Sequence, residues 1–220
     1  MIAEELIHNN IVPLRTSDTG EEALGIMADF YVRHLPIVNN TQLLGLISED
    51  DLLDHDPETP VGAMDLSLPR PYVKKSDHFY EVFRLLALHQ LSVIPVVEDS
   101  DDTYIGLITQ DDALQFFARL GGFSEPGSII VLETSRRGYS LAEIARIVES
   151  ENASVLNAFA SSSLDGSTLE VTIKVNTQND SAILATFERF GYEVKGSFKE
   201  ASYGDILKER YDAFMNYLNV

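Results

Sequence analysis

The first half of the chain carries the same order of apolar and polar positions twice. An offset of 59 residues places Ser17-Asp18 on Ser76-Asp77 and keeps apolar residues opposite apolar residues in the runs that follow. After two extra residues in the second copy, residues 45–53 (GLISEDDLL) fall on residues 106–114 (GLITQDDAL), and six of these nine positions are identical. A repeated pattern indicates a repeated structural unit, so we expect two similar modules before residue 123.

Each copy predicts the order strand, helix, strand, strand, helix. A short extended segment leads to a polar Ser-Asp cap and then to a helix with apolar residues at helical spacing. Two runs rich in β-branched residues follow, joined by a polar turn, and Ser48 or Thr109 opens the last helix. His55–Pro60, with two prolines, predicts the connector between the copies. The predicted strands are Ile11–Leu14, Leu35–Val38 and Leu43–Ile47 in the first copy, and Tyr72–Val73, Val93–Val97 and Tyr104–Ile108 in the second.

The pattern changes after the turn-rich stretch Gly121–Gly127, which we interpret as a domain boundary. A capping box, Ser140–Glu143, opens one predicted helix, and Asp165-Gly166 predicts a hairpin turn. The next helix is expected to turn three apolar residues inward, namely Ile183, Phe187 and Phe190. The predicted strands Ile129–Glu133, Val155–Ser161, Leu169–Val175 and Tyr192–Lys199 complete the βαββαβ order of a ferredoxin-like unit.

Residues 201–220 predict a C-terminal helix with one apolar stripe. The stripe consists of Leu207, Tyr211, Phe214 and Leu218, whose spacings of four, three and four residues fit one helix face. We expect this helix to pack on its own domain or on a second subunit. The fold class is therefore α/β (α+β), with repeats at 1–60 and 61–123, a ferredoxin-like domain at 127–200 and a helix at 201–220.

The composition narrows the classes of partner. The 220 residues include 16 Lys and Arg against 35 Asp and Glu, a formal net charge of −19. So large an excess of acid repels nucleic-acid phosphates and anionic lipid surfaces, so we expect no nucleic acid and no membrane as partners. The chain has no Cys, which excludes disulfides and thiolate chemistry. We expect a cytoplasmic protein that binds small molecules or other proteins.

The repeated motif resembles a known family. The run His34–Val38 followed by Gly45–Leu52 is repeated as Val93–Val97 followed by Gly106–Ala113. This pattern resembles tandem cystathionine-β-synthase (CBS) domains, a Bateman module. The domain order and length resemble the acetoin utilisation protein B group of small regulatory proteins. The resemblance implies a ligand sensor that forms a homodimer and acts on a regulated protein that the sequence does not identify.

Two hydroxyl-and-carboxylate motifs carry the candidate chemistry. A helix N-terminus with a hydroxyl can hold a phosphate, and a carboxylate three residues later can accept hydrogen bonds from ribose hydroxyls. The resemblance implies a nucleotide site formed by Ser48, Asp51, Leu35 and Pro36 in the first copy and by Thr109, Asp112, Ile94 and Pro95 in the second, with Arg33 and His34 near a phosphate. Pure helix capping is the alternative for the same residues.

The expected regulatory ligand is AMP, ADP, ATP or S-adenosylmethionine. Each motif carries an extra acid beside the key aspartate, Asp50 in the first copy and Asp111 in the second. These carboxylates oppose a triphosphate unless a cation compensates. AMP, ADP and S-adenosylmethionine are therefore at least as well matched as ATP.

The start of the ferredoxin-like region also resembles a known family. The stretch Arg136–Ala145 resembles the opening of an ACT domain, although the usual proline before the glycine is absent. The resemblance implies amino-acid binding near Gly138 and Ser140. An alternative function is thus an amino-acid-sensing ACT domain with the CBS pair as a dimerisation scaffold. A dimerisation module that binds no ligand is a third hypothesis.

Other chemistries have no support in the sequence. The five His residues show no His-x-x-x-His or His-x-His spacing, so we expect no metal site. The stretch Gly20–Gly25 imitates a phosphate loop but lacks the following Lys-Ser/Thr pair, and no nucleophile elbow is present. We therefore expect no catalytic residues, no required cofactor and no enzymatic activity.

Overall fold

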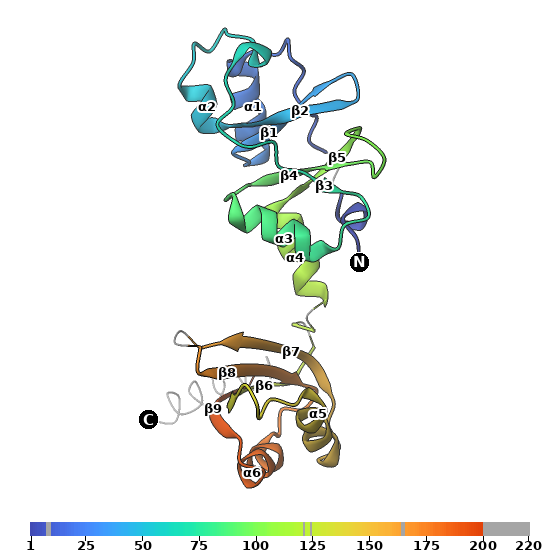
Figure 1. Cartoon of the computed structure of the whole chain (residues 1–220), viewed down its shortest axis with the longest axis vertical. Coiled ribbons are helices and arrows are strands. Elements are labelled where there is room, and N and C mark those ends of the chain that lie inside the picture. The colour runs from blue at the N-terminus through green and yellow to red at the C-terminus, as the bar shows by residue number, and fades with distance from the viewer. Residues whose placement is uncertain (8–9, 121, 124, 164–165, 200–220) are drawn as a thin grey trace, which may run out of the picture. The chain divides into compact units, whose positions relative to one another are not determined.

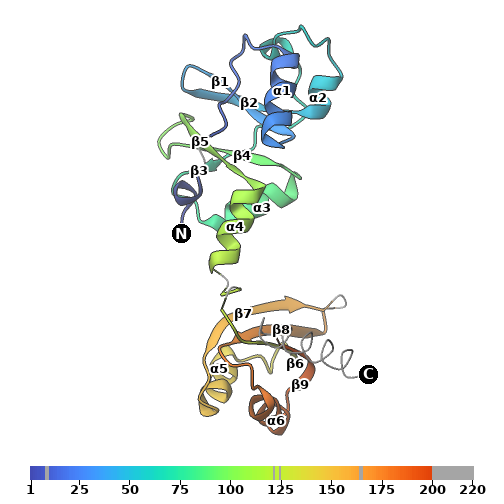
Figure 2. The same cartoon turned by 180° about the vertical axis from the view of Figure 1, so that it is seen from behind.

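The computed structural model describes residues 1–7, 10–120, 122–123, 125–163 and 166–199 of the chain. It separates into two compact units, Met1–Phe117 and Ala118–Val220. Figures 1 and 2 show the elements of each unit from opposite sides. No helix in the described part of the chain is long and apolar enough to cross a membrane.

The first repeat is built around a two-stranded hairpin. Its elements are α1 (Gly20–Phe30), β1 (His34–Asn39), β2 (Gln42–Ser48) and α2 (Glu49–Leu53), and β1 pairs with β2 in antiparallel fashion. Thr19 caps α1, because its side chain accepts a hydrogen bond from Glu22 N–H while the Glu22 carboxylate accepts one from Thr19 N–H. The predicted Ser17-Asp18 cap is thus wrong. The carboxylate of Asp18 instead accepts a hydrogen bond from Arg15 N–H, at 2.7 Å.

The predicted first strand of this repeat is reduced to a single residue. Within Ile11–Leu14, only Leu14 pairs with β1, through a parallel bridge to Ile37. Its N–H donates to Pro36 O and its carbonyl accepts from Val38 N–H, each at 2.8 Å. The expected strand is therefore a single bridge.

The second repeat contains the same elements with a fuller sheet. They are β3 (Val73–Lys74), α3 (Phe79–Leu88), β4 (Val93–Val97), β5 (Tyr104–Thr109) and α4 (Gln110–Leu120). β4 pairs with β3 in parallel and with β5 in antiparallel fashion. His78, rather than the predicted Ser76-Asp77 pair, is the N-cap of α3. A shift in pairing register occurs at Ile37/Val38 in the first repeat and at Val96/Val97 in the second, so the irregularity is duplicated as well.

Backbone hydrogen bonds join the two repeats directly. At the hairpin tips, Leu43 N–H donates to Asp102 O at 3.1 Å and Tyr104 N–H donates to Thr41 O at 2.7 Å. One cluster of buried apolar residues runs through both repeats. The two repeats therefore share a single core.

The N-terminal residues are bound to the second repeat. A short 3-10 helix, η1 (Ala3–Leu6), opens the chain, and the side chain of Ala3 is fully buried. Its N–H donates to Asp77 O at 2.8 Å, and Glu4 N–H donates to Lys75 O at 3.1 Å. A second 3-10 helix, η2 (Val61–Ala63), lies between the repeats in sequence.

The second unit has a four-stranded antiparallel sheet. Its elements are β6 (Ser128–Ser135), α5 (Leu141–Ser150), β7 (Val155–Ser162), β8 (Thr168–Val175), α6 (Ser181–Arg189) and β9 (Glu193–Lys199). The strand order β7-β8-β6-β9 is that of a ferredoxin-like split unit. Both helices lie on one face of the sheet (Figures 1 and 2), where Ile130, Leu132 and Phe187 are fully buried.

One inward residue of the second unit was predicted wrongly. Phe190 follows α6 rather than lying within it, and 48% of its surface is exposed. The chain leaves helical geometry at this residue, so the helical spacing no longer turns it inward. The predicted C-terminal helix, 201–220, lies outside the described residues.

Candidate functional site

The two hydroxyl-and-carboxylate motifs occupy equivalent strand-to-helix junctions. Ser48 ends β2 and is the N-cap of α2, and Thr109 ends β5 directly before α4. Ser48 Oγ accepts from Asp51 N–H at 3.1 Å, and Asp51 Oδ2 accepts from Ser48 N–H at 3.0 Å. Thr109 and Asp112 exchange the same two bonds at 3.0 and 3.2 Å. Both pairs therefore cap their helices.

Asp51 makes one hydrogen bond beyond those that cap α2. Only 8% of its surface is exposed, and its Oδ1 accepts a further hydrogen bond from Ser67 N–H at 3.3 Å. Burial acts to raise the pKa of Asp51, but the hydrogen bonds from Ser48 and Ser67 outweigh burial and lower this pKa below its usual value. The carboxylate is thus ionised at neutral pH and links α2 to the segment that enters the second repeat.

A cleft of about 340 Å³ lies beside Ser48. Its volume is at the lower end of the range of about 300–1,000 Å³ that is typical of small-molecule sites. One wall comes from the first repeat and the other comes from the segment after η2 and from the end of α3. The lining residues are Arg33, His34, Ser48, Glu49, Asp50, Ser67, Leu68, Leu88, His89 and Gln90.

His34 connects this cleft to the junction between the repeats. Its Nδ1 accepts from Ser92 N–H at 3.1 Å and lies 3.0 Å from Ser92 Oγ, which itself accepts from Arg33 N–H at 2.8 Å. Because a backbone N–H can only donate, Nδ1 carries no proton and the ring proton is on Nε2. His34 therefore presents an N–H donor without a positive charge.

The electrostatic surroundings favour this neutral form of His34. Burial and the Arg33 charge lower the pKa of His34, and this effect outweighs the opposing attraction of Asp51 and Asp50. Arg33 is the one Lys or Arg among the lining residues that the structure describes, and the acids Glu49 and Asp50 line the same cleft. The cleft thus contains more negative than positive charge.

The predicted apolar partners of the base lie elsewhere. Leu35 and Ile94 are fully buried, and Pro36 and Pro95 are buried beside them in β1 and β4. None of the four lines the cleft beside Ser48, because both strands lie in the shared core of the repeats.

Sequence reasoning missed the apolar wall of this cleft. Leu68 and Leu88, both from the second repeat, provide it. Nothing in their residue types or spacing marks them as cleft residues, because their position depends on how the repeats pack together.

The second unit has its own cleft, of about 490 Å³. Gly138 lines this cleft, whereas Ser140 caps α5 by accepting from Glu143 N–H at 3.2 Å. Tyr192 OH donates to Glu143 Oε2 at 2.8 Å, and burial together with this carboxylate raises the pKa of Tyr192 to about 12. The described lining includes Glu133, Glu143 and Glu193 but no Lys or Arg. The carboxylate of an amino acid would thus meet several like charges there.

The described residues contain no group of three His, Asp or Glu side chains placed to hold a metal ion.

Comparison with known proteins gives the family. A model of the CBS domain matches residues 3–58 and 63–119, slightly more than half of the 220 residues. Inosine-5'-monophosphate dehydrogenase from Methanocaldococcus jannaschii is 25% identical over 114 residues, which are 51% of this chain and 23% of the dehydrogenase. The chain therefore spans about a quarter of the length of this curated relative.

Comparison with solved structures also gives matches that cover about half of the chain. A CBS domain pair/ACT domain protein from Thermotoga maritima has 22% identity and a TM-score of 0.49, covering 54% of this chain and 98% of its own. A Vibrio cholerae protein assigned to acetoin utilization has 26% identity and a TM-score of 0.47, covering 55% and 92%. CBSX2, solved in complex with AMP, has 21% identity and a TM-score of 0.45, covering 54% and 96%.

Proposed function

Because this chain belongs to the CBS domain family, we propose that it is a regulatory protein whose CBS pair binds an adenine nucleotide or a related adenosyl ligand. The observation that carries the proposal is the cleft of about 340 Å³ beside Ser48, whose walls come from both repeats. A ligand in this cleft would contact the starts of β1 and α2 together with the end of α3. Its binding free energy would therefore depend on how the two repeats are placed against each other.

The residues around the cleft have distinct chemical roles in this proposal. The Arg33 guanidinium and the His34 Nε2–H are donors for a phosphate or for the acceptor atoms of a base. Asp51 does not line the cleft itself but is hydrogen-bonded to Ser48, which does. Each carboxylate oxygen of Asp51 has a second lone pair, which in this proposal accepts a ribose hydroxyl. Leu68 and Leu88 supply the apolar contact for a purine. Thr109 and Asp112 are the corresponding candidates in the second repeat.

The charge of the cleft favours ligands with few negative charges. Glu49 and Asp50 lie beside the single Arg33, and α2 has only five residues, so little helix dipole is available to hold a phosphate. AMP and S-adenosylmethionine should thus bind more tightly than ATP in the absence of a divalent cation. Replacing Asp50 with Asn removes one negative charge from the cleft. This variant should therefore show a smaller difference in affinity between AMP and ATP.

The regulatory step follows from differential affinity. A ligand that binds one arrangement of the repeats more tightly shifts the equilibrium toward that arrangement. We propose that the second, ACT-like unit or a partner protein responds to this shift, within a homodimer.

The test is thermal unfolding of the full chain with AMP, ADP, ATP and S-adenosylmethionine in turn. A ligand at a hundredfold its Kd adds about 2.7 kcal/mol to stability, which appears as a shift of several degrees. Calorimetric titration of Arg33→Gln should then show at least tenfold weaker binding. The matched control is Arg84→Gln, because Arg84 pairs with Glu81 on the exposed surface of α3.

Two outcomes contradict the proposal. In one, none of the four adenosyl compounds raises the unfolding temperature. In the other, Arg33→Gln and Arg84→Gln bind the ligand equally well, which would place the site outside this cleft.

A second candidate function has one observation in its favour. Gly138 lines the 490 Å³ cleft of the second unit, so an amino acid could bind there with the CBS pair as a scaffold. A Cβ added at Gly138 would lie 3.0 Å from Thr134 Oγ1, so Gly138→Ala disturbs this turn. Amino-acid binding that is lost in Gly138→Ala but kept in Asp112→Ala would favour this alternative.

A further inference from the structure

The face of the second unit's sheet that is turned away from its helices is apolar at its centre. The pairing registers place two rows of residues across the four strands on this face. One row consists of Phe159, Thr172, Val131 and Gly196, and the other consists of Asn157, Lys174, Ile129 and Phe198. Ser197, which lies between Gly196 and Phe198, points to the opposite face, where its Oγ donates to Asp180 at the start of α6.

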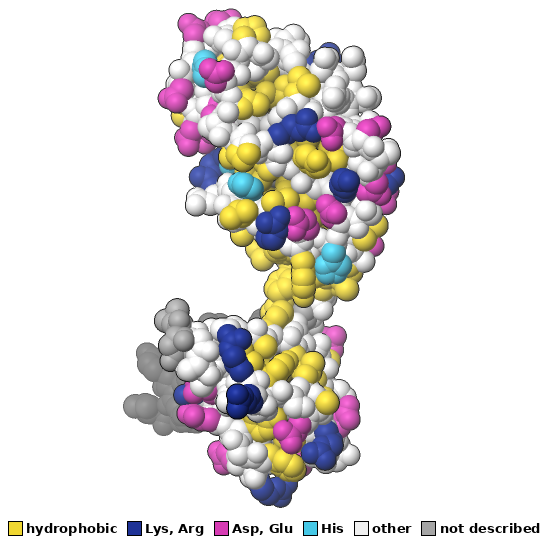
Figure 3. All heavy atoms as spheres, viewed as in Figure 1, with side chains coloured by type: hydrophobic (Ala, Val, Ile, Leu, Met, Phe, Trp, Pro, Cys, Tyr) yellow, Lys and Arg dark blue, Asp and Glu magenta, His cyan; other side chains and the backbone are white. Residues whose placement is uncertain are grey.

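Large apolar side chains are exposed in these rows. Phe159 is 43% exposed and Phe198 is 60% exposed, while Ile129 and Val131 are half-buried between them. The ring of Phe198 leans over Gly196, because a Cβ built there would lie 3.2 Å from the ring. Figure 3 shows hydrophobic side chains exposed over β7 and β8 on the side it presents. A contiguous apolar patch of this kind indicates an interaction surface.

The one lysine in these rows does not expose its charged end on this face. Lys174 is only 5% exposed, and its Nζ donates to Phe123 O at 3.1 Å. A small hollow of about 50 Å³ lies beside it, lined by Phe123, Ile129, Asn157, Phe159, Thr172 and Lys174. The hollow is the size of one apolar side-chain tip rather than of a ligand.

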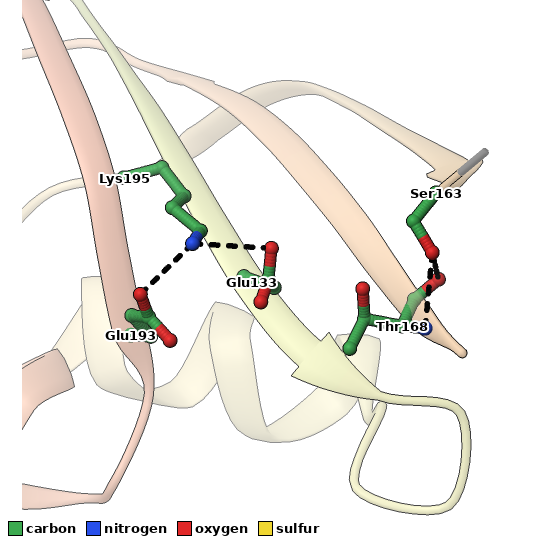
Figure 4. A network of polar contacts seen from close by, with 5 residues as sticks. All are labelled: Glu133, Ser163, Thr168, Glu193 and Lys195. Carbon is green, nitrogen blue, oxygen red and sulfur yellow. Dashed lines mark hydrogen bonds and ion pairs between the residues drawn. The ribbon is translucent and has the colours of Figure 1, made fainter. Parts of the chain in front are cut away.

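Charged residues limit the patch at one end. Glu133 pairs in register with Glu170 on one side and with Glu193 on the other. Lys195 Nζ lies 3.3 Å from Glu133 Oε2 and 2.9 Å from Glu193 Oε1. Figure 4 shows Lys195 in contact with both carboxylates. An occupant of the apolar rows therefore ends before this charged row.

We propose that residues 201–220 of the same chain cover this face. The segment follows β9 directly, and β9 is an edge strand that carries Phe198. Its apolar stripe runs from Leu207 to Leu218, which is about 16 Å along a helix at 1.5 Å per residue. Four strands about 4.8 Å apart span about 14 Å, so the stripe matches the width of the sheet. Residues 200–206 can reach across up to about 23 Å when extended.

The choice of this occupant over a second copy rests on tethering. A segment joined to the edge of the sheet meets it at a high effective concentration, whereas a second copy must bind from solution. The proposal does not depend on ligand binding by the CBS pair, so the two can fail separately.

Engineered disulfides test the proposal, because the chain has no Cys of its own. The full chain with Thr172→Cys, in the apolar rows of this face, and Tyr211→Cys, in the middle of the stripe, should form an intrachain disulfide under mild oxidation. The matched control combines Thr172→Cys with Glu209→Cys. Position 209 lies about 200° around a helix from Leu207, so its cysteine should pair at least tenfold more slowly.

Mass analysis without reductant separates the outcomes. A monomer with an intrachain disulfide only in the Tyr211 pair supports the proposal. An interchain disulfide would assign the face to a second copy and overturn it. Equal oxidation of the two pairs, or of neither, would also overturn it.

Hydrogen exchange supplies a second measurement that requires no crosslink. Phe214→Asp in the full chain should speed exchange in peptides from β7 and β9 several-fold and leave peptides from residues 1–117 unchanged. Glu209→Ala should change neither set. Unchanged exchange in β7 and β9 in Phe214→Asp would show that the segment does not cover this face.

Discussion

Replacing Asp51 with Asn tests whether its carboxylate holds the first unit together. The substitution keeps the size of the side chain but leaves one acceptor oxygen where there were two. One of the two backbone donors, Ser48 N–H or Ser67 N–H, then faces an amide NH₂ group. Asp50→Asn is the matched control, because Asp50 is the neighbouring acid and its side chain is exposed.

The expected cost follows from the hydrogen bonds lost. A hydrogen bond to a charged group contributes about 1.5–3 kcal/mol, and loss of a helix cap costs about 0.5–2 kcal/mol. We therefore expect Asp51→Asn to lower the free energy of unfolding of the first unit by about 2 kcal/mol, and its Tm by about 8 °C. Asp50→Asn should stay within about 0.5 kcal/mol of the unchanged chain.

Urea unfolding followed by hydrogen exchange and mass spectrometry provides the assay, because it reports each unit separately. The pH dependence adds a second criterion. Hydrogen bonding lowers the pKa of Asp51, so its contribution is present above the usual Asp value of about 3.9 and is lost as the pH falls through the lower folded value. The difference in unfolding free energy between Asp51→Asn and the unchanged chain should thus be constant at neutral pH and narrow as the pH falls below about 3.9.

Either of two results would refute this reasoning. The first is an Asp51→Asn cost no larger than that of Asp50→Asn. The second is a difference that stays constant as the pH is lowered, since the stabilisation would then not arise from the ionised carboxylate.

Three further predictions concern other parts of the chain. Because burial and the neighbouring charge lower the pKa of His34, the first unit should lose stability as the pH falls below about 6.5, and His34→Gln should flatten this part of the urea-midpoint profile. Gly127→Ala should cost about 2 kcal/mol or more by urea unfolding of the second unit, because the new Cβ would lie 2.0 Å from Val175 O. Tyr192→Phe should cost about 1 kcal/mol in the same assay, because it removes only the hydrogen bond to Glu143; a midpoint equal to the unchanged chain would contradict this.

Local sequence signals were sufficient for the fold class. The repeat predicted the duplicated hairpins, and the alternation in 169–175 predicted β8, one of the two central strands of the second unit's sheet. These signals depend on neighbours within a few residues. The prediction of Ser-Asp caps was wrong because the helices begin one or two residues later, so the side chains of Thr19 and His78 accept hydrogen bonds from the first backbone N–H groups.

The candidate site was less accessible to sequence reasoning. The motif of Ser48 and Asp51 was visible, but the hydrogen bond from Ser67 to Asp51 joins residues 16 positions apart and depends on the fold. The contact of His34 with Ser92 spans 58 positions. Contacts between residues so far apart in the sequence produce no periodic pattern, so a single sequence does not predict them.

The attachment of residues 3–6 to the second repeat bears on how the polypeptide is assembled during translation. The amides of Ala3 and Glu4 receive their acceptors only when Lys75 and Asp77 have been made, and Thr41 receives its donor only with Tyr104. The tip of the first hairpin therefore receives these backbone partners only when the second hairpin, about 60 residues later in the chain, has been made. If the gene were divided between codons 60 and 61, each fragment would lack backbone hydrogen-bond partners that the other fragment provides. The two repeats, although similar in sequence, therefore cannot replace each other.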